Sequence, residues 1–354
     1  MKSASLVLIA LVVACSGPAT AQPPAASQAT SISPEAVSAP SPTWSLGLRP
    51  TATSTVDFAC RLPVSAGGAP GPQGAFIDFP SGTVTPDPAA PEVNSLIRPG
   101  RDLYGYYPTF YYDRPYSRWL PVSRKAVSPD GAHYAFTDRP LINPPGPLTR
   151  ATIHVVAVKT GIDSAFDGGD WTAPYVVLDF AAEGIYLITD YGVYVGLWLM
   201  DPTTGVVARI ANLLNVQGSA GSNVFWVGTH NPSDRHPVTG SAPNQLERLS
   251  LVDGSRVVWF YRPGSSVHLI SQDASGDPII IVSGVNWSEL RLVLGPGIDR
   301  SIWTDGDRVP VISDPISDNH GTWFGGPDGI FLYSNANGIQ KVSNQPGYPA
   351  NGCL

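Results

Sequence analysis

The sequence lacks a basic stripe, and this absence excludes one large class of function. Its formal net charge is −7, and only 14% of its residues are charged. Without a basic stripe, the chain has no electrostatic footprint for nucleic acid. An acidic protein is also poorly attracted to anionic lipid headgroups. We therefore expect no nucleic-acid partner, and no membrane binding other than through a lipid anchor.

Motifs that mark an active site or a metal site are also missing. The six histidines show no H-x-x-x-H spacing, and the chain has no Cys-x-x-Cys pair. There is no G-x-S-x-G elbow and no segment with the spacing of a calcium loop. We therefore predict no catalytic residue, no metal and no cofactor, although one sequence cannot show carboxylates that converge from distant loops.

The N-terminus has the organisation of an export signal. One positive charge precedes a short apolar run, Leu6–Ala14, which predicts a signal peptide formed by the first 14 residues. The segment Val12–Cys15 resembles a bacterial lipobox, which implies lipidation of Cys15 and a lipoprotein anchored to the cell membrane. Cleavage after Ala21 is the alternative, and it would release a soluble secreted protein that begins at Gln22.

The stretch 15–54 is rich in proline, alanine, serine and threonine, and it predicts a disordered tether ahead of a folded domain at 55–354. Two cysteines remain in that domain, Cys60 and Cys353. In an oxidising compartment, an even pair favours a disulfide over two free thiols. Such a bond would contribute up to about 4–5 kcal/mol in the chain-entropy model.

A repeated hairpin dominates the folded region. Each copy has two alternating strands around a glycine that supplies the positive φ of a tight turn. Five successive turn glycines are 41 to 49 residues apart, and a sixth copy precedes them. The turn glycines are Gly82, Gly161, Gly205, Gly254, Gly297 and Gly338.

A second, shorter strand pair precedes most of these hairpins. Its copies are VSPDGAHYAF, DFAAEGIYLI, SQDASGDPIIIV and SDNHGTWFGG. Four short strands in a repeat of this length predict an all-β chain folded as a β-propeller. Six blades fit the repeats. Seven are the alternative, because the insertion from Thr85 to Tyr116 is long enough to contain further strands.

The repeats carry a family resemblance. The run Ser128–Gly131 followed by Tyr134–Phe136 resembles the repeat of TolB-type propellers. The segment 318–333 is similar to a blade of sensor and lyase-type propellers. The resemblance implies the fold and almost nothing about function. Its turn residues are Asp130, Gly131, Asp318 and Gly321, and a clasp between Cys60 and Cys353 would close the ring near both ends of the domain.

The long loop Gly228–Gln245 offers candidate ligand residues. It joins two strands of the predicted fourth blade, where a few residues would suffice. Its polar side chains, which suit an anion or carbohydrate hydroxyls, belong to His230, Asp234, Arg235 and His236. The alternative interpretation is a solvated excursion on the rim.

The segment Asp102–Val122 holds an unusual concentration of aromatic residues. Tyrosine and tryptophan bury a large area and keep a polar tip, which suits a wet groove or a sugar platform. The same property suits packing between blades, and packing is the interpretation that we favour. The candidate ligand residues of this segment are Tyr107, Tyr111, Tyr112 and Trp119.

These patterns favour a non-catalytic, extracytoplasmic binding or scaffolding module of the bacterial cell envelope. Its expected partner is a cell-envelope protein or glycan, and we expect a monomer. Two alternatives remain open. One is a propeller-type enzyme (a lyase, lactonase or glycosidase) with its site at the central channel, and the other is an extracytoplasmic sensor of a small ligand.

Overall fold

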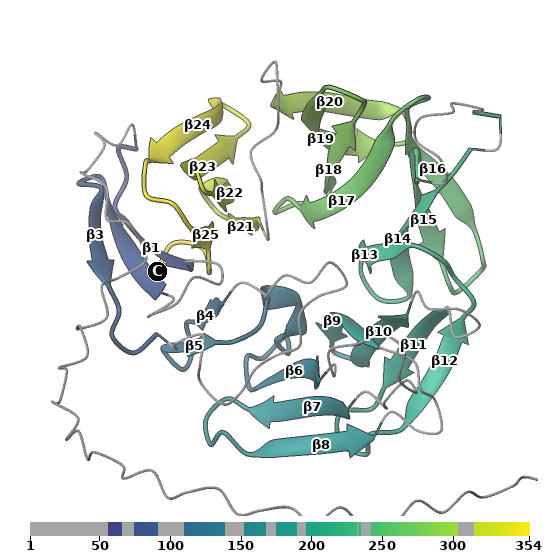
Figure 1. Ribbon diagram of the computed structural model, residues 1–354, viewed down its shortest axis with the longest axis horizontal. Helices are drawn as coiled ribbons and strands as arrows, with labels where there is room; N and C mark the ends of the chain where they lie inside the picture. The colour runs from purple at the N-terminus through teal and green to yellow at the C-terminus, as the bar shows by residue number, and fades with distance from the viewer. Residues whose placement is uncertain are drawn as a thin grey trace, which may run out of the picture. The chain divides into compact units, whose positions relative to one another are not determined.

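The computed structural model describes residues 56–65, 74–90, 110–138, 152–167, 175–189, 196–231, 233–234, 242–303 and 315–354. They belong to the second of two units into which the chain divides, Met1–Ser41 and Pro42–Leu354. Their sheets form the six blades of a β-propeller (Figure 1), which confirms the predicted fold class and blade number. Within these ranges, no helix has the length and apolarity needed to cross a membrane.

The first blade combines both ends of the described chain. Its strand order is β25-β1-β2-β3, so the last strand lies beside the first one. Val64 pairs with Pro349 and Ser65 with Tyr348, in antiparallel register. The predicted closure of the ring near the two ends is therefore present as a strand pair. The strands are β1 (Cys60–Ser65), β2 (Gly74–Phe79), β3 (Thr83–Pro86) and β25 (Tyr348–Pro349).

The second blade is preceded by an additional small hairpin, formed by β4 (Tyr111–Asp113) and β5 (Arg118–Leu120). A 3-10 turn, η1 (Arg124–Ala126), leads from it to Val127, which bridges to Tyr134 at the inner edge of the blade. The blade continues with β6 (His133–Asp138), β7 (Thr152–Ala157) and β8 (Asp163–Asp167).

The other four blades are four-stranded antiparallel sheets in sequence order. Blade 3 has β9 (Val176–Ala181), β10 (Gly184–Thr189), β11 (Gly196–Met200) and β12 (Val207–Ala211). Blade 4 has β13 (Val216–Ser219), β14 (Val224–Thr229), β15 (Gln245–Ser250) and β16 (Arg256–Tyr261). Blade 5 has β17 (Ser266–Gln272), β18 (Pro278–Ser283), β19 (Ser288–Gly295) and β20 (Ile298–Trp303). Blade 6 has β21 (Ile316–Asp318), β22 (Gly321–Gly326), β23 (Gly329–Ser334) and β24 (Gly338–Ser343).

The six predicted hairpins join the two outer strands of each blade. Their turn glycines all adopt φ between 67° and 73°, a region where other residues are strained. The sequence pattern therefore located the same turn in every blade.

Burial follows the position of a strand within its blade. The middle strands are packed by neighbouring blades on both faces, so β18 and β23 are almost entirely buried. The outer strands face water on one side, and most of β8 is exposed. The inner strands β9, β13, β17, β21 and β25 surround the centre of the ring (Figure 1). Side chains that point inward from them can therefore converge on the propeller axis.

Candidate functional site

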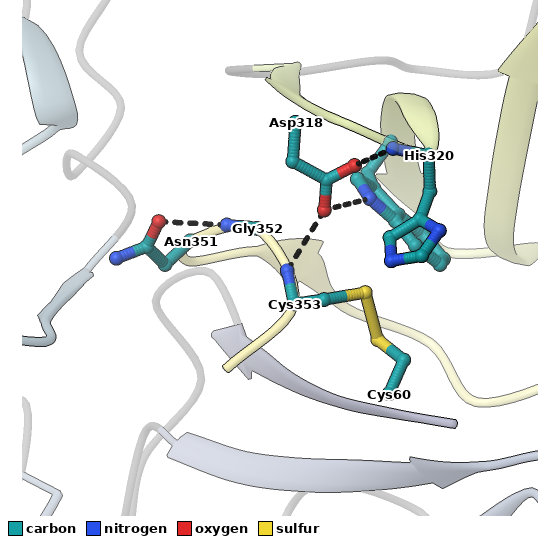
Figure 2. Close-up of a disulfide and its surroundings, with 7 residues drawn as sticks. Cys60, Asp318, His320, Asn351, Gly352 and Cys353 are labelled. Atoms are coloured by element: carbon teal, nitrogen blue, oxygen red, sulfur yellow. Dashed lines mark hydrogen bonds between the residues drawn. A yellow bond between two sulfur atoms is a disulfide. The ribbon is translucent and has the colours of Figure 1, made fainter. Parts of the chain in front are cut away.

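The ring is closed by a disulfide and by one shared carboxylate (Figure 2). Cys60 at the start of β1 is bonded to Cys353, with 5.2 Å between the two Cα atoms and 293 residues between the two positions. The carboxylate of Asp318 accepts hydrogen bonds from the backbone of His320, the indole of Trp323 and the backbone of Cys353, each at 2.8 Å. The predicted clasp is thus present, and a repeat-turn aspartate supports it.

The repeat turns are structural elements of their blades. Asp130 accepts hydrogen bonds from the hydroxyl of Ser128 and from a backbone N–H of its own turn, and both lower its pKa. Gly131 and Gly321 supply positive φ values of 71° and 141°. Of the two aspartates singled out from the sequence, Asp318 differs, because its contacts extend beyond its own turn to the C-terminal segment.

The aromatic hairpin β4–β5 packs on blade 1. Trp119 and Phe76 are buried, and the Tyr112 and Trp119 rings meet edge to face with 5.2 Å between their centroids. The Trp119 indole donates a hydrogen bond of 2.9 Å to Asp87. These two candidate residues therefore pack into a seam of the fold, where Trp119 is buried and Tyr112 is half-buried.

The base of the long loop is tied to the start of blade 5. Asp234 accepts hydrogen bonds from the Asn244 amide at 2.7 Å and from the Gly264 backbone at 2.8 Å. The ring nitrogens of His230 lie 3.3 Å and 3.1 Å from carbonyl oxygens of the same loop. The described part of the loop therefore uses both candidate side chains to fix its own conformation.

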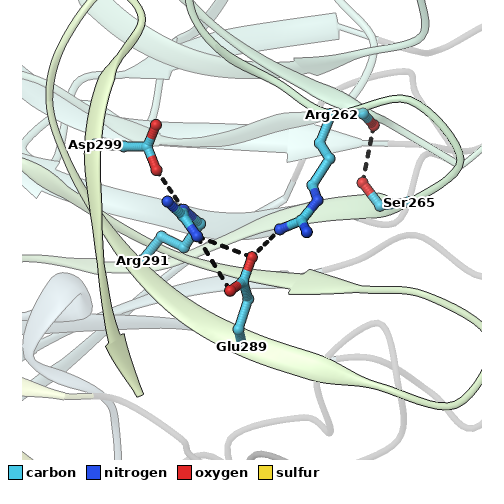
Figure 3. Close-up of polar contacts among 5 residues, drawn as sticks. All are labelled: Arg262, Ser265, Glu289, Arg291 and Asp299. Carbon is cyan, nitrogen blue, oxygen red and sulfur yellow. Dashed lines mark hydrogen bonds and ion pairs between the residues drawn. The ribbon is translucent and has the colours of Figure 1, made fainter. Parts of the chain in front are cut away.

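An ionic group lies at the same junction between blades 4 and 5 (Figure 3). Glu289 is 7% exposed and accepts hydrogen bonds from Arg262 and from Arg291, which also pairs with Asp299. Burial acts to lower the pKa of Arg291, but its bonds to the two carboxylates outweigh burial and raise it. The guanidinium of Arg262 also lies 4.5 Å from the centroid of the Trp287 ring.

Two cavities lie on the axis, where inner strands of different blades meet. The first, which we name the Tyr111 cavity, has a volume of about 220 Å³. It is lined by segments of blades 1, 2, 5 and 6 and by the aromatic hairpin. Its polar and aromatic lining includes Tyr111, Arg124, Lys125, Ser271, Ser317 and Asn351.

The second axial cavity, which we name the Asp179 cavity, has a volume of about 210 Å³. It is lined by inner segments of blades 2, 3, 4 and 5. Lys125 and Ser271 belong to both cavities, so the two spaces adjoin. The side chains and backbone around it include Lys125, Leu178, Asp179, Ser219, Ser271 and Gln272.

Bulges in three inner strands aim residues at the axis. In β9 the register shifts between Val177 and Asp179, which pair with consecutive residues of β10. Similar shifts lie between Val216 and Gly218 in β13 and between Leu269 and Ser271 in β17. A bulge turns two consecutive residues toward one side of a strand. Consecutive residues of β9 and of β17 accordingly line the same axial cavity.

Hydrogen bonds between inner strands fix the lining of the axis. The Ser219 hydroxyl donates to Asp179 of blade 3, and the Gln272 amide donates to the Ser219 carbonyl. Ser317 of blade 6 donates to the Gln272 carbonyl at 3.1 Å. These contacts link blades 3 to 6 in succession, so the polar groups of the axis are held in place before any ligand binds.

The charge on the axis comes mainly from η1. Arg124 lies over the Tyr111 ring, 5.5 Å from its centroid. The pKa of Tyr111 is raised, because the effect of burial outweighs the lowering effect of the nearby Arg124. Burial likewise raises the pKa of Asp113, against the lowering effects of the Tyr116 N–H and of Arg124. Lys125 is exposed to both cavities, and in the part of the chain that the structure describes its side chain has no ion-pair or hydrogen-bond partner.

A third cavity, of about 350 Å³, lies between blades 2 and 3. It is lined by Asp130, His133, Phe180 and Pro202, among others. The carboxylate here is engaged in its own turn, so this cavity offers a ligand fewer open polar groups than the axis does.

Sequence reasoning missed the axial residues Arg124, Lys125 and Asp179. Their convergence depends on the ring, and no motif or spacing announces it. A cation pair directly before the Ser128–Gly131 repeat was the one available signal. Four predicted residues lie outside the described part of the chain: Cys15, Tyr107, Arg235 and His236.

Comparison with known proteins yields likeness in fold alone. No family model and no curated protein sequence matches the chain. Among solved structures, TolB from Acinetobacter baumannii is 12% identical, with a TM-score of 0.48, over 82% of this chain and 64% of that one. The chain thus corresponds to less than two thirds of that protein.

Two other similar structures are, by name, a binding protein and an enzyme. An auxiliary nutrient binding protein from Bacteroides thetaiotaomicron is 9% identical, with a TM-score of 0.39, over 81% of this chain and 83% of that one. A lignostilbene dioxygenase from Pseudomonas brassicacearum is 12% identical, with a TM-score of 0.38, over 71% of this chain and 73% of that one. The similar structures thus include one named as a binding protein and one named as an enzyme, and the chain itself is described by its fold, a six-bladed β-propeller.

Proposed function

We propose that this protein is a non-catalytic binding module of the bacterial cell envelope, with its ligand site on the propeller axis. The ligand carries a small anionic group, which Lys125 binds. The observation that carries this proposal is the position of Lys125, a residue that lines two adjoining cavities and whose ammonium group has no partner among the described residues.

On the side of the Tyr111 cavity, the surroundings of Lys125 support an anion rather than a cation. Arg124 adds a second positive charge in the Tyr111 cavity. No Asp or Glu is among the described residues that line the Tyr111 cavity, so an anion there faces no carboxylate of the lining. Cavity volumes of about 220 Å³ and 210 Å³ suit a small molecule or one terminal group of a larger envelope component.

The disulfide supports the extracytoplasmic part of the proposal. A bond between Cys60 and Cys353 forms and persists in oxidising compartments and is rare in the cytosol. Anchoring through Cys15 is the finer part of the proposal. Intact mass measurement of the full chain from a bacterial host tests it, because acylation adds a lipid mass that a Cys15→Ser variant lacks.

The test of the axial site measures the unfolding temperature of the full chain with small anions. Acetate, succinate and inorganic phosphate are compared with neutral acetamide at the same ionic strength. A ligand that binds only the folded state raises the unfolding temperature in proportion to its saturation. We expect the anions to stabilise the wild type and to lose this effect in Lys125→Met, which removes the charge and keeps the side-chain length.

Lys159→Met is the matched control, because Lys159 is exposed in the β7–β8 turn, away from both axial cavities. The control should respond to anions as the wild type does. An equal response in all three proteins, or no response in any, would overturn the proposal. Chemical conversion of a bound anion would instead favour the alternative of a propeller-type enzyme.

A further inference from the structure

We propose that the ligand of the Asp179 cavity is a free α-amino acid, held by its carboxylate at Lys125 and by its ammonium group at Asp179. This inference rests on the proposed axial binding function and names its ligand class. It comes from the juxtaposition, in one small cavity, of a cation and a carboxylate that are not paired with each other.

The two charges face the same space from different blades. Lys125 belongs to η1 of blade 2, and Asp179 to β9 of blade 3. Among the described residues the two groups form no ion pair, although both line one cavity of about 210 Å³. A ligand between them can therefore contact each charge with an opposite charge of its own.

Asp179 keeps one oxygen open for such a ligand. Its Oδ2 accepts the hydroxyl of Ser219, and no described group donates to its Oδ1. The side chain is half-buried, so an unpaired carboxylate here is more costly than one on the surface. A ligand ammonium group at Oδ1 would remove that cost and donate up to three hydrogen bonds.

The sum of the charges selects a zwitterion over a simple anion. The lining of the Asp179 cavity carries one positive and one negative charge, so an anion at Lys125 also meets the repulsion of Asp179. An α-amino acid is neutral overall and satisfies both groups. A cation such as a simple amine satisfies Asp179 and is repelled by Lys125.

The neutral lining suits a ligand with a small or polar side chain. The hydroxyls of Ser219 and Ser271 and the amide of Gln272 surround the charges, with Leu178 as an apolar neighbour. Ser271 and Lys125 also border the Tyr111 cavity, which gives the ligand side chain space to extend. Hydrogen bonds between the blades hold these groups in place, so ordering them on binding costs little.

The experiment measures binding of glycine, alanine and serine to the full chain by calorimetry. Each amino acid is compared with its N-acetyl form, which lacks the ammonium group, and with its amide, which lacks the carboxylate. We expect each free amino acid to bind at least tenfold more tightly than either blocked form. Equal binding of free and N-acetylated amino acids to the wild type would overturn the assignment of Asp179 as the ammonium partner.

Two variants assign the two ends of the ligand. Asp179→Asn should abolish the preference for the free amino acid over its N-acetyl form, and Lys125→Met should abolish the preference over the amide. Lys159→Met should keep both preferences. If Asp179→Asn fails to fold, the comparison of ligand forms on the wild type still decides the question.

The outcomes separate this inference from the proposed function. If acetate and succinate stabilise the wild type through Lys125 but free amino acids bind no better than their N-acetyl forms, the axial anion site stands and the zwitterion assignment fails. If neither simple anions nor amino acids bind, both fail. If amino acids bind and both variants keep wild-type preferences, the ligand lies elsewhere and the assignment is wrong.

Discussion

The junction that closes the ring and the junction between blades 4 and 5 are held together by different interactions. At the closure, two residues of β25 pair with β1, and the disulfide and Asp318 reinforce the contact. At the other junction, Glu289 accepts hydrogen bonds from Arg262 and Arg291, and buried apolar residues such as Trp226 and Val267 fill the interface.

The difference reflects the connectivity of the chain. Blades 4 and 5 are joined by a short peptide segment between β16 and β17, so they remain close together even when their contacts open. Blades 6 and 1 meet through residues that lie almost 300 positions apart, and bringing such residues together has a large entropic cost. A covalent bond is therefore most effective at the closure, because it removes that cost from folding.

The largest expected effect follows from removal of the disulfide. Replacing both cysteines, as Cys60→Ala with Cys353→Ala, should lower the free energy of unfolding by about 2–5 kcal/mol. Denaturant unfolding of the variant and the wild type, each with and without reductant, provides the measurement. The reduced wild type should behave like the variant, whereas unchanged midpoints in both would show that the strand pair alone closes the ring.

A smaller effect is expected from Asp318, which connects blade 6 with the C-terminal segment. Asp318→Ala leaves three N–H groups without their acceptor and should cost about 2–3 kcal/mol. Asp318→Asn retains one oxygen and should cost less. Thermal unfolding measures both variants.

The matched control is Asp273→Ala, in the corresponding turn of blade 5. The hydrogen bonds of Asp273 go to the backbone of Ser275 and Asp277, within its own turn. This variant should lose about 1 kcal/mol. If both variants lose the same free energy of unfolding, the contacts of Asp318 to the C-terminal segment add no stability beyond that of an ordinary turn.

The smallest effect is expected at the junction of blades 4 and 5. Glu289→Gln keeps the shape of the side chain and removes its charge, and should cost about 1–2 kcal/mol, because the Arg262 side chain is 40% exposed and screened by water. Unfolding should be followed at low and high salt, since salt weakens a partly exposed ion pair.

Asp78→Asn is the control, because the Arg61–Asp78 pair spans 3.7 Å between exposed groups and should contribute less than about 0.5 kcal/mol. Equal losses in the two variants would contradict a specific role for Glu289.

The sequence predicted those parts of the fold that depend on local chemistry. Each hairpin turn needs a residue with positive φ, and a glycine such as Gly161 marks it directly. The pairing of Cys60 with Cys353 followed from a count of cysteines together with the expected export. Six blades followed from the period of the repeats.

The axial site was not predictable in the same way, because it depends on distant segments. Lys125 and Asp179 come to line one cavity only after blades 2 and 3 have packed and a bulge has formed in β9. The placement of the aromatic candidates depends on the folded ring in the same way: Tyr111 lines an axial cavity, whereas Trp119 is buried. Trp119 has the properties of a ligand platform, and its burial against Phe76 becomes visible only in the folded ring.

The position of Cys60 has a mechanical consequence. A pulling force applied through the residues before Val56 would enter the domain just ahead of β1. Without the disulfide, such a load would open the β1–β2 ladder from its end, one hydrogen bond after another. With it, the load passes at Cys60 to Cys353 and, through Asp318, into blade 6. The ring then resists tension as a closed loop, in which several strands must yield together.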